Sequence, residues 1–179
     1  MSKLAFIFPG QGAQKAGMGK DFYENSEAAR SFFDQAQKIL DFDLKEMCFG
    51  EHEELNLTEY TQPCMVSVCL AIVQELKKRG INPDITAGLS LGEYAAVAAA
   101  GGMNELDAIK LVRRRGILMQ STVPAGEGAM AAVLGLDAKK IEEILESFEN
   151  VWIANYNCPG QIVITCLLYT SDAADELDG

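Results

Sequence analysis

Residues 88–94 read GLSLGEY, with Ser90 at the centre of a G-x-S-x-G pattern. A serine hydroxyl becomes a useful nucleophile when a neighbouring base takes its proton. Small residues beside it let the backbone turn sharply so that Ser90 projects, and a helix that begins just after it aims N–H groups at a developing oxyanion. The same spacing also suits an ordinary strand-to-helix turn, so the motif alone leaves both interpretations open.

A base for this serine is not evident in the sequence. The chain of 179 residues has one histidine, His52, in the acidic run 51–54 (EHEE). Such a run is typical of a solvated surface, and we do not expect His52 to be the base. Cys64 and Cys69 fall on a predicted helix, have no activating partner near them in sequence and are expected to lie in the core. A cysteine nucleophile is therefore not indicated.

Two glutamines stand at the starts of predicted features, one in a loop after a strand and one at the entry to a helix. Gln11 lies in residues 10–14 (GQGAQ), directly after a predicted strand, where loops of open α/β sheets meet ligands. The loop lacks the G-x-G-x-x-G and G-K-[ST] patterns of nucleotide binding. Gln11 could offer an amide donor to a neighbouring loop, or the segment could be a flexible turn. Gln62 stands with Pro63 at the predicted start of a long helix, where proline in the first turn is common.

Arg115 interrupts an apolar stripe on a predicted helix. Arg113 and Arg114 have a lysine or a glycine among their helical neighbours and are expected to be more exposed. A buried guanidinium needs an anion, and its planar fork suits a carboxylate. The partner of Arg115 is either an internal Asp or Glu or the carboxylate of a substrate. The neighbours three and four positions from Arg115, all apolar, are Leu111, Val112, Leu118 and Met119.

Strand, motif and helix follow one another around Ser90 in the order that a nucleophile elbow requires. Residues 85–87 are apolar and predict a short strand before the motif, and the alanine-rich residues 93–100 predict a helix after it. Residues 4–8 predict another short strand before the glutamine loop. Because this run is continuously apolar, we expect the strand to be buried on both faces, as in a parallel sheet.

Helices account for most of the remaining first part of the chain. Residues 41–60 are acidic and are expected to be irregular. The caps and apolar spacing predict three further helices, over residues 25–40 with Asn25 or Ser26 as cap, over residues 62–79, and over residues 104–120 with Asn104 as cap. Together with the two strands they predict an α/β domain.

The pattern changes at Gly126. Strands are predicted over residues 129–136, 151–154 and 161–165, and a helix capped by Asp137 follows the first of them. This β-α-β-β order is the first two thirds of a ferredoxin-like unit. We therefore divide the chain into residues 1–125, residues 126–166 and an acidic tail, residues 167–179, which has no clear apolar period.

Composition argues against several classes of protein. The net charge of −11 disfavours nonspecific nucleic-acid binding. No targeting segment is evident, and no apolar run approaches the roughly 18 residues of a spanning helix. The five cysteines are odd in number and form no C-x-x-C pair, so neither a disulfide framework nor a zinc site is indicated. We expect a cytoplasmic protein with reduced thiols that binds neither nucleic acid nor membrane.

Six segments together resemble the malonyl-CoA:acyl carrier protein transacylases of bacterial fatty acid synthesis. The resemblance covers residues 1 to about 165, and the order and spacing of the segments make it specific. The segments are FPGQGAQ (8–14), TQPC (61–64), GLSLGEYAA (88–96), RRRGILMQ (113–120), GAMAAVLGL (128–136) and NYNCPGQIVIT (155–165).

The resemblance implies a mechanism and a fold. Ser90 would take the malonyl group from coenzyme A as an ester, and the phosphopantetheine thiol of acyl carrier protein would then remove it. Gln11 and the N–H of Leu91 would form the oxyanion hole, and Arg115 would bind the malonyl carboxylate, with Gln62 also in the substrate site. Malonyl-CoA is then a substrate, no cofactor or metal is implied, and the full-length enzyme is expected to be a monomer. The implied fold is an α/β-hydrolase-like core with an inserted ferredoxin-like subdomain, both incomplete in this chain.

The sequence departs from the family pattern in three places. Leu89 stands where many members have a histidine before the serine, a replacement that is familiar in the family. The family's base is a histidine shortly after the ferredoxin-like insertion, and this chain stops inside that insertion. We therefore expect the base to be absent and the chain to be inactive. The tail, residues 167–179, does not resemble the family and is typical of out-of-frame or vector-derived sequence.

Three alternatives belong to other classes. A carboxylesterase or lipase would also use G-x-S-x-G, but it should carry an H-G-G-G-type loop and would give Arg115 no role. An acyltransferase domain of a polyketide synthase shares the motifs, although a methionine at residue 1 favours a stand-alone protein. A noncatalytic module that binds carrier protein would be separated from the enzymes by attempted malonyl transfer.

Overall fold

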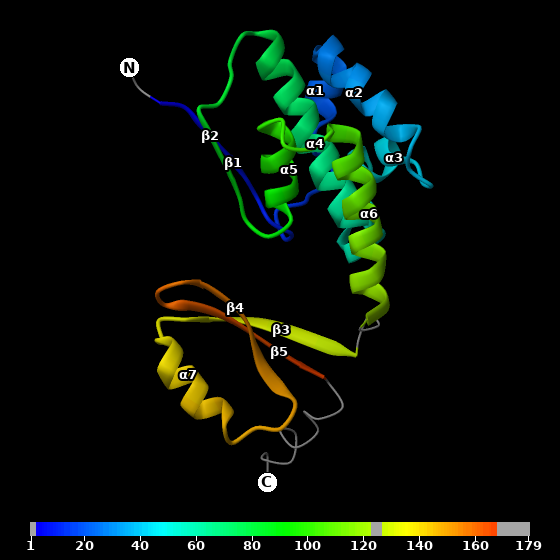
Figure 1. Ribbon diagram of the computed structural model, residues 1–179. Helices are drawn as coiled ribbons and strands as arrows, with labels where there is room; N and C mark the ends of the chain where they lie inside the picture. The colour runs from blue at the N-terminus through cyan, green and yellow to red at the C-terminus, as the bar shows by residue number, and fades with distance from the viewer. Residues whose placement is uncertain (1–2, 123–126, 168–179) are drawn as a thin grey trace. The chain divides into compact units, whose positions relative to one another are not determined.

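The computed structural model describes residues 3–122 and 127–167. They fall into two compact units, Met1–Ser121 and Thr122–Gly179 (Figure 1). All five residues expected at the active site belong to the first unit. Within the described ranges, no helix combines the length and the apolar character needed to span a membrane.

The first unit combines two parallel strands with a group of helices (Figure 1). Its elements are β1 (Ala5–Phe8), α1 (Lys20–Asn25), α2 (Glu27–Gln37), α3 (Leu44–Phe49), the 3-10 helix η1 (Glu53–Asn56), α4 (Thr58–Lys78), β2 (Ile85–Gly88), α5 (Gly92–Ala99) and α6 (Glu105–Thr122). α4 packs against α2 and α5, and α5 also packs against both strands. The predicted α/β character of this part of the chain is confirmed.

The predicted helix caps are confirmed by their hydrogen bonds. Ser26 Oγ accepts from the Ala29 N–H at 3.1 Å at the start of α2. Asn104 Oδ1 accepts from the Leu106 N–H at 3.0 Å at the start of α6. The strands β1 and β2 and the helix α5 also lie where the sequence predicts them.

Residues 41–60, which were expected to be irregular, contain α3 and η1. α3 begins after Asp43, whose Oδ1 accepts from the N–H groups of Lys45 and Glu46, both at 3.0 Å. An acidic cap followed three residues later by glutamate is a sequence signal for a helix start, and it is present here. The prediction failed because a helix of six residues is too short to show an apolar period.

α4 begins at Thr58, four residues before its predicted start, so Pro63 lies inside the helix. The prediction that Pro63 occupies the first turn was therefore wrong. Proline has no N–H, and the carbonyl four residues earlier, that of Glu59, loses its helical hydrogen bond. A side chain from α6 supplies the missing donor.

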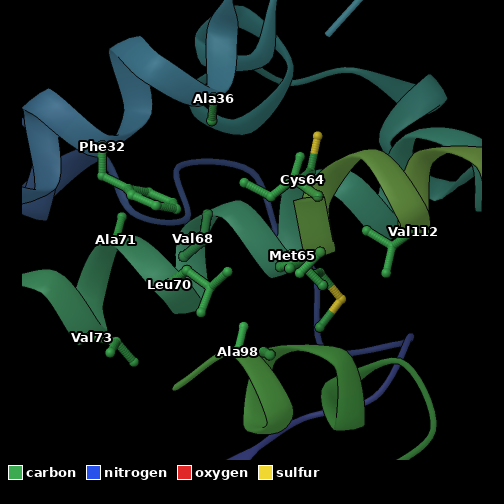
Figure 2. Packing of buried hydrophobic residues seen from close by; sticks show 14 of the residues in the cluster. Phe32, Ala36, Cys64, Met65, Val68, Leu70, Ala71, Val73, Ala98 and Val112 are labelled. Carbon is green, nitrogen blue, oxygen red and sulfur yellow. The ribbon is translucent and has the colours of Figure 1, made fainter. Parts of the chain in front are cut away.

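The core of the first unit surrounds α4 (Figure 2). Leu70 and Ala71 of α4 are fully buried, as is Cys64. Cys69 is half-buried at the border of the same core. Around α4, the labelled side chains of Figure 2 come from three other helices: Phe32 and Ala36 from α2, Ala98 from α5 and Val112 from α6.

β1 and β2 pair in parallel, with Phe8 opposite Gly88 where both strands end. Phe8 is buried, but Ile7 is 79% exposed. The prediction that β1 is buried on both faces was therefore wrong. Among the described residues, no helix covers the face of β1 that carries Ile7. An apolar groove of about 410 Å³ also lies along β1, between this strand and α4. Parallel sheets are normally covered on both faces.

The second unit is a three-stranded antiparallel sheet with one helix. Its elements are β3 (Gly128–Leu134), α7 (Ala138–Leu145), β4 (Val151–Cys158) and β5 (Gln161–Leu167). β5 lies between β3 and β4 and runs antiparallel to both. Asp137 Oδ1 accepts from the Lys140 N–H at 2.9 Å, so the predicted cap of α7 is confirmed.

The last two strands are longer than the sequence predicts. β4 and β5 pair as far as Cys158 opposite Gln161, which leaves a turn of two residues between them. Leu167, expected to begin the tail, pairs with Gly128 at the end of β5. The remaining tail, residues 168–179, and the domain boundary predicted between residues 125 and 126 lie outside the described residues.

Candidate active site

Ser90 sits in a strained backbone conformation between β2 and α5. Its φ is 49°, in the left-handed region, which costs a residue other than glycine roughly 1–2 kcal/mol. An ordinary turn would place glycine at this position, whereas here the two glycines of the motif flank the serine. Strain of this kind clusters at functional sites. The exposed side chain of Ser90 therefore favours the nucleophile over the plain turn.

The two glycines of the motif are required by the close approach of backbone segments. A Cβ at Gly88 would lie 2.1 Å from the Gly92 carbonyl carbon, and a Cβ at Gly92 would lie 2.4 Å from the Phe8 carbonyl oxygen. The first contact closes the turn around Ser90. The second brings the start of α5 against the end of β1. Glycine at both positions thus lets the serine turn and the neighbouring strand come together.

The loop that carries Gln11 lies beside the serine turn. β1 and β2 end at the same edge of the sheet, and a Cβ at Gly10 would be 3.0 Å from the Leu89 carbonyl oxygen. Gln11 is exposed, and its Nε2 donates to Thr58 Oγ1 at 3.0 Å. Among the described residues, the backbone N–H groups of Gln11 and Leu91 donate no hydrogen bond. The hydrogen bonds of this part of the fold thus leave both N–H groups unused.

Arg115 is half-buried, and its Cζ lies 5.6 Å from the centre of the Tyr94 ring. Tyr94 belongs to α5, the helix that follows Ser90. No carboxylate of residues 3–122 or 127–167 forms an ion pair with Arg115. Of the two partners left open for Arg115, an internal Asp or Glu is therefore not found in the described part of the chain.

The expected buried stripe around Arg115 was wrong. Of its four apolar neighbours only Val112 is buried; Leu111 is 44% exposed and Leu118 is 50% exposed. The reason is the rotation of α6, which packs on the core through Ala108, Ile109, Val112 and Gly116 and turns the other face outward. Helical spacing identified an apolar face correctly but could not tell which face the core would cover.

Arg113, expected to be exposed, is the arginine that the protein itself pairs. Its side chain is 13% exposed, and its Nε and Nη2 donate to the two oxygens of Asp41, both at 2.8 Å. The Phe42 and Tyr60 rings lie 5.2 and 5.0 Å from its Cζ. The hydrogen bond from Arg113 also holds the pKa of Asp41 below its ordinary value. The sequence missed this role because the partners lie far away along the chain.

Arg113 also replaces the hydrogen bond that Pro63 removes from α4. Its Nη1 donates to the Glu59 carbonyl oxygen at 2.8 Å and to the Glu59 carboxylate at 3.1 Å. The helices can come this close because α6 has glycine at the crossing, where a Cβ at Gly116 would lie 2.8 Å from Glu59 Cα. Pro63 of α4, together with Arg113 and Gly116 of α6, thus forms one junction between the two helices.

This junction predicts a coupling between Arg113 and Pro63. Arg113→Gln should lower the free energy of unfolding by roughly 1.5–3 kcal/mol, the usual contribution of hydrogen bonds to charged groups. In a Pro63→Ala background residue 63 has its own N–H for the Glu59 carbonyl, so the same replacement should cost less. Urea unfolding of the four proteins measures the difference. Arg114→Gln, at an exposed neighbouring position, is the matched control, and equal losses in both backgrounds would argue against the shared carbonyl.

Gln62 is fully buried and faces α6. Its Nε2 donates to Met119 Sδ at 3.3 Å, and Met119 lies one helical turn after Arg115. Its Oε1 is buried without any hydrogen-bond donor among the described residues. A buried amide oxygen without a donor is costly, and a bound water or ligand group would satisfy it.

Among the described residues, no hydrogen bond joins Ser90 to the histidine or to the other candidate nucleophiles. His52 Nε2 pairs with Glu46 Oε1 of α3 at 3.0 Å. A hydrogen bond with Cys48, together with burial, raises the pKa of the Cys64 thiol far above its ordinary value, and burial raises that of Cys69 to about 11. Both shifts oppose formation of a thiolate. Among the described residues, no three His, Cys, Asp or Glu side chains cluster as metal ligands would.

Comparison with known proteins places this site in a family. The model described as "Acyl transferase domain" matches residues 5–176, so the chain belongs to the acyl transferase family. It is 47% identical over 182 residues to the malonyl CoA-acyl carrier protein transacylase of Bacillus subtilis (strain 168). The solved transacylase of Clostridium perfringens superposes with a TM-score of 0.86 at 44% identity. A malonyl-transacylase in complex with its type II PKS acyl-carrier protein superposes with a TM-score of 0.84 at 38% identity.

The chain spans little more than half the length of these relatives. The Bacillus subtilis alignment covers 99% of this chain and 57% of the relative. The superpositions on the two solved structures include 98% of this chain, but only 57% of the Clostridium perfringens protein and 58% of the transacylase in the carrier-protein complex. Over this shared part the protein has the mixed α/β fold of the transacylases. The family match also runs to residue 176, past residue 165, where the resemblance was expected to end.

Proposed function

We propose that this chain carries the nucleophile, the oxyanion site and the carboxylate-binding arginine of a malonyl-CoA:acyl carrier protein transacylase of fatty acid synthesis. The observation that carries the proposal is Ser90, held at a φ of 49° between two glycines that the backbone contacts require. The 47% identity to the Bacillus subtilis transacylase supports the choice of substrates. Because the chain matches 57% of that relative, the proposal concerns a protein in which the rest of the fold is present.

Malonyl transfer at this site takes two displacements. Ser90 Oγ gives its proton to a base and attacks the thioester carbonyl of malonyl-CoA. The C–S bond then breaks, coenzyme A leaves as the thiol after taking up that proton, and a malonyl ester remains on Ser90. The phosphopantetheine thiol of acyl carrier protein attacks the ester, forms the new thioester and returns a proton to Ser90. In both tetrahedral intermediates the oxyanion accepts hydrogen bonds from the backbone N–H groups of Gln11 and Leu91.

Arg115 binds the malonyl carboxylate in this proposal. Two observations support it: the guanidinium has no ion-pair partner among the described residues, and it lies over Tyr94 on the helix that follows Ser90. A planar guanidinium suits a carboxylate, which acetyl-CoA lacks. Gln62, whose buried Oε1 lacks a donor beside α6, is assigned to the same substrate site.

The finer fold and setting belong to the same proposal. We assign residues 1–125 to a hydrolase-like core, which the elbow at Ser90 supports, and residues 126–166 to part of a ferredoxin-like subdomain, which the strand order β3-β5-β4 supports. The interpretation of residues 167–179 as a non-native tail stays a prediction. The complete protein would work as a cytoplasmic monomer without a cofactor, with acyl carrier protein as its partner.

Covalent labelling tests the proposed function. The test protein is a fusion, called the extended chain, in which residues 1–167 continue into the remaining part of the Bacillus subtilis relative. Radiolabelled malonyl-CoA should leave acid-stable label on this protein, and acyl carrier protein bearing phosphopantetheine should remove it. Ser90→Ala should abolish the label, and Ser147→Ala, on the surface of the second unit, should not. Label that survives Ser90→Ala, or an extended chain that is folded but takes none, would contradict the proposal.

A further inference from the structure

The loop 10–14 is tied to the end of η1 and the start of α4 by two side-chain hydrogen bonds. Gln11 Nε2 donates to Thr58 Oγ1 at 3.0 Å, and Gln14 Nε2 donates to Asn56 Oδ1 at 3.1 Å. Gln14 also closes the loop on itself, because its Oε1 accepts from the Gly12 N–H at 2.7 Å. Both glutamines of GQGAQ are therefore used as tethers.

A glycine-rich loop needs such tethers if it is to hold a catalytic group. Gly12 has a φ of 108°, a conformation that only glycine adopts readily, and Gly10 packs closely on the serine turn. Glycine backbone loses more conformational freedom than any other on being fixed. The Gln11 N–H can stabilise an oxyanion only if it is fixed before the reaction, since its contribution depends on preorganisation. The hydrogen bonds of the Gln11 and Gln14 side chains restrict the backbone of loop 10–14, which its glycines would otherwise leave free to move.

One of the two acceptors, Thr58, is itself held by α6. The Thr58 N–H donates to Gln120 Oε1 at 3.1 Å, and a Cβ at Gly116 would lie 2.8 Å from the Thr58 carbonyl oxygen. The next residue, Glu59, is bound by Arg113. Contacts with α6, the helix that also carries Arg115, thus hold Thr58 in place.

We propose that Thr58 and Asn56 are positioning residues for the oxyanion site. They hold the loop 10–14 against the serine turn, through the side chains of Gln11 and Gln14, so that the Gln11 N–H faces the reacting carbonyl. This inference rests on the proposed function. The pair, called the loop clasp, touches no reacting atom and acts only through the two glutamines.

Matched variants of the extended chain test the clasp. Thr58→Val keeps the shape and loses the acceptor, and it should lower kcat for malonyl transfer about 3- to 10-fold, as expected for one hydrogen bond in the rate-limiting geometry. Thr58→Ser keeps the hydroxyl and should restore most of the rate. Asn56→Leu and Asn56→Asp form the corresponding pair at the second point of the clasp. The KM for malonyl-CoA should change little, because the clasp does not contact the carboxylate site.

A double-mutant cycle separates positioning from a general structural effect. If Thr58 acts through the Gln11 side chain, Thr58→Val should have no further effect on kcat in a Gln11→Ala background. The contact is also measurable in the 179-residue chain itself, labelled with nitrogen-15 glutamine. There the side-chain amide signal of Gln11 should move toward that of a free glutamine in Thr58→Val and stay in place in Thr58→Ser.

The outcomes of these measurements are distinguishable. An extended chain that transfers malonyl equally well with valine and with serine at residue 58 overturns the clasp and leaves the proposed function standing. Equal losses caused by Thr58→Val with and without the Gln11 side chain also overturn it. A folded extended chain that is not acylated at Ser90 overturns the proposed function and, with it, the catalytic role of the clasp.

Discussion

The 179-residue chain alone should transfer malonyl groups at least about 10⁴-fold more slowly than the extended chain. Its one histidine, His52, is paired with Glu46 of α3, and within residues 3–122 and 127–167 no hydrogen bond joins the Ser90 side chain to a possible base. General base catalysis contributes about 10²–10⁴-fold, and removing the base from a serine–histidine unit costs about 10⁶-fold in the best-studied case. The free N–H groups of Gln11 and Leu91 cannot compensate, because they stabilise the oxyanion only after attack.

The comparison is made with radiolabelled malonyl-CoA and acyl carrier protein, using equal amounts of the two proteins. Ser90→Ala in each protein sets the background. Transfer by the short chain at a rate near that of the extended chain, and lost in Ser90→Ala, would mean that the short chain supplies a base. His52→Ala would then identify or exclude the histidine. Circular dichroism of both proteins guards against comparing a folded with an unfolded chain.

Arg115→Ala in the extended chain should reduce malonyl transfer about 10- to 150-fold more than acetyl transfer. The expected difference corresponds to roughly 1.5–3 kcal/mol for a charge-assisted contact that only malonyl can make. The structure supports this role because the protein supplies Arg113 with two acidic partners and, within the described ranges, supplies Arg115 with none. The measurement is kcat/KM for malonyl-CoA and for acetyl-CoA with each variant.

Two neighbouring replacements serve as controls for this selectivity. Arg114→Ala removes the same charge from the same helix at an exposed position and should leave the ratio of malonyl to acetyl transfer unchanged. Arg115→Lys keeps the charge but loses the planar fork, so it should recover part of the malonyl rate. A parallel fall of both activities in Arg115→Ala would assign the residue to structure rather than to carboxylate binding.

The local features around Ser90 could be predicted from the sequence because each depends on residues close together in the chain. The turn needs small residues at positions 88 and 92, and the structure shows the backbone contacts that exclude a side chain there. The caps Ser26, Asn104 and Asp137 bind N–H groups two or three residues further on. The short α3 is the exception, since its six residues carry a cap signal but no apolar period.

The tertiary structure decided which residues of each predicted element face the core and which meet across it. Spacing on α6 placed Arg115 in an apolar stripe, but α6 packs on the core through another face, which includes Val112 and Gly116, and the Arg113 side chain is the one largely buried. The partners of Arg113 are 72 and 54 residues away in sequence and that of Gln11 is 47 away, so no local pattern could reveal them. The sequence by itself predicted the turn at Ser90 and the family, and it made Ser90 the candidate nucleophile. The packing of α6 on the start of α4 decided three further features, because each depends on how segments distant in sequence approach one another. Arg113 binds acidic residues within the protein, and Arg115 has no ion-pair partner in the described part of the chain. Thr58, at the start of α4, accepts a hydrogen bond from Gln11.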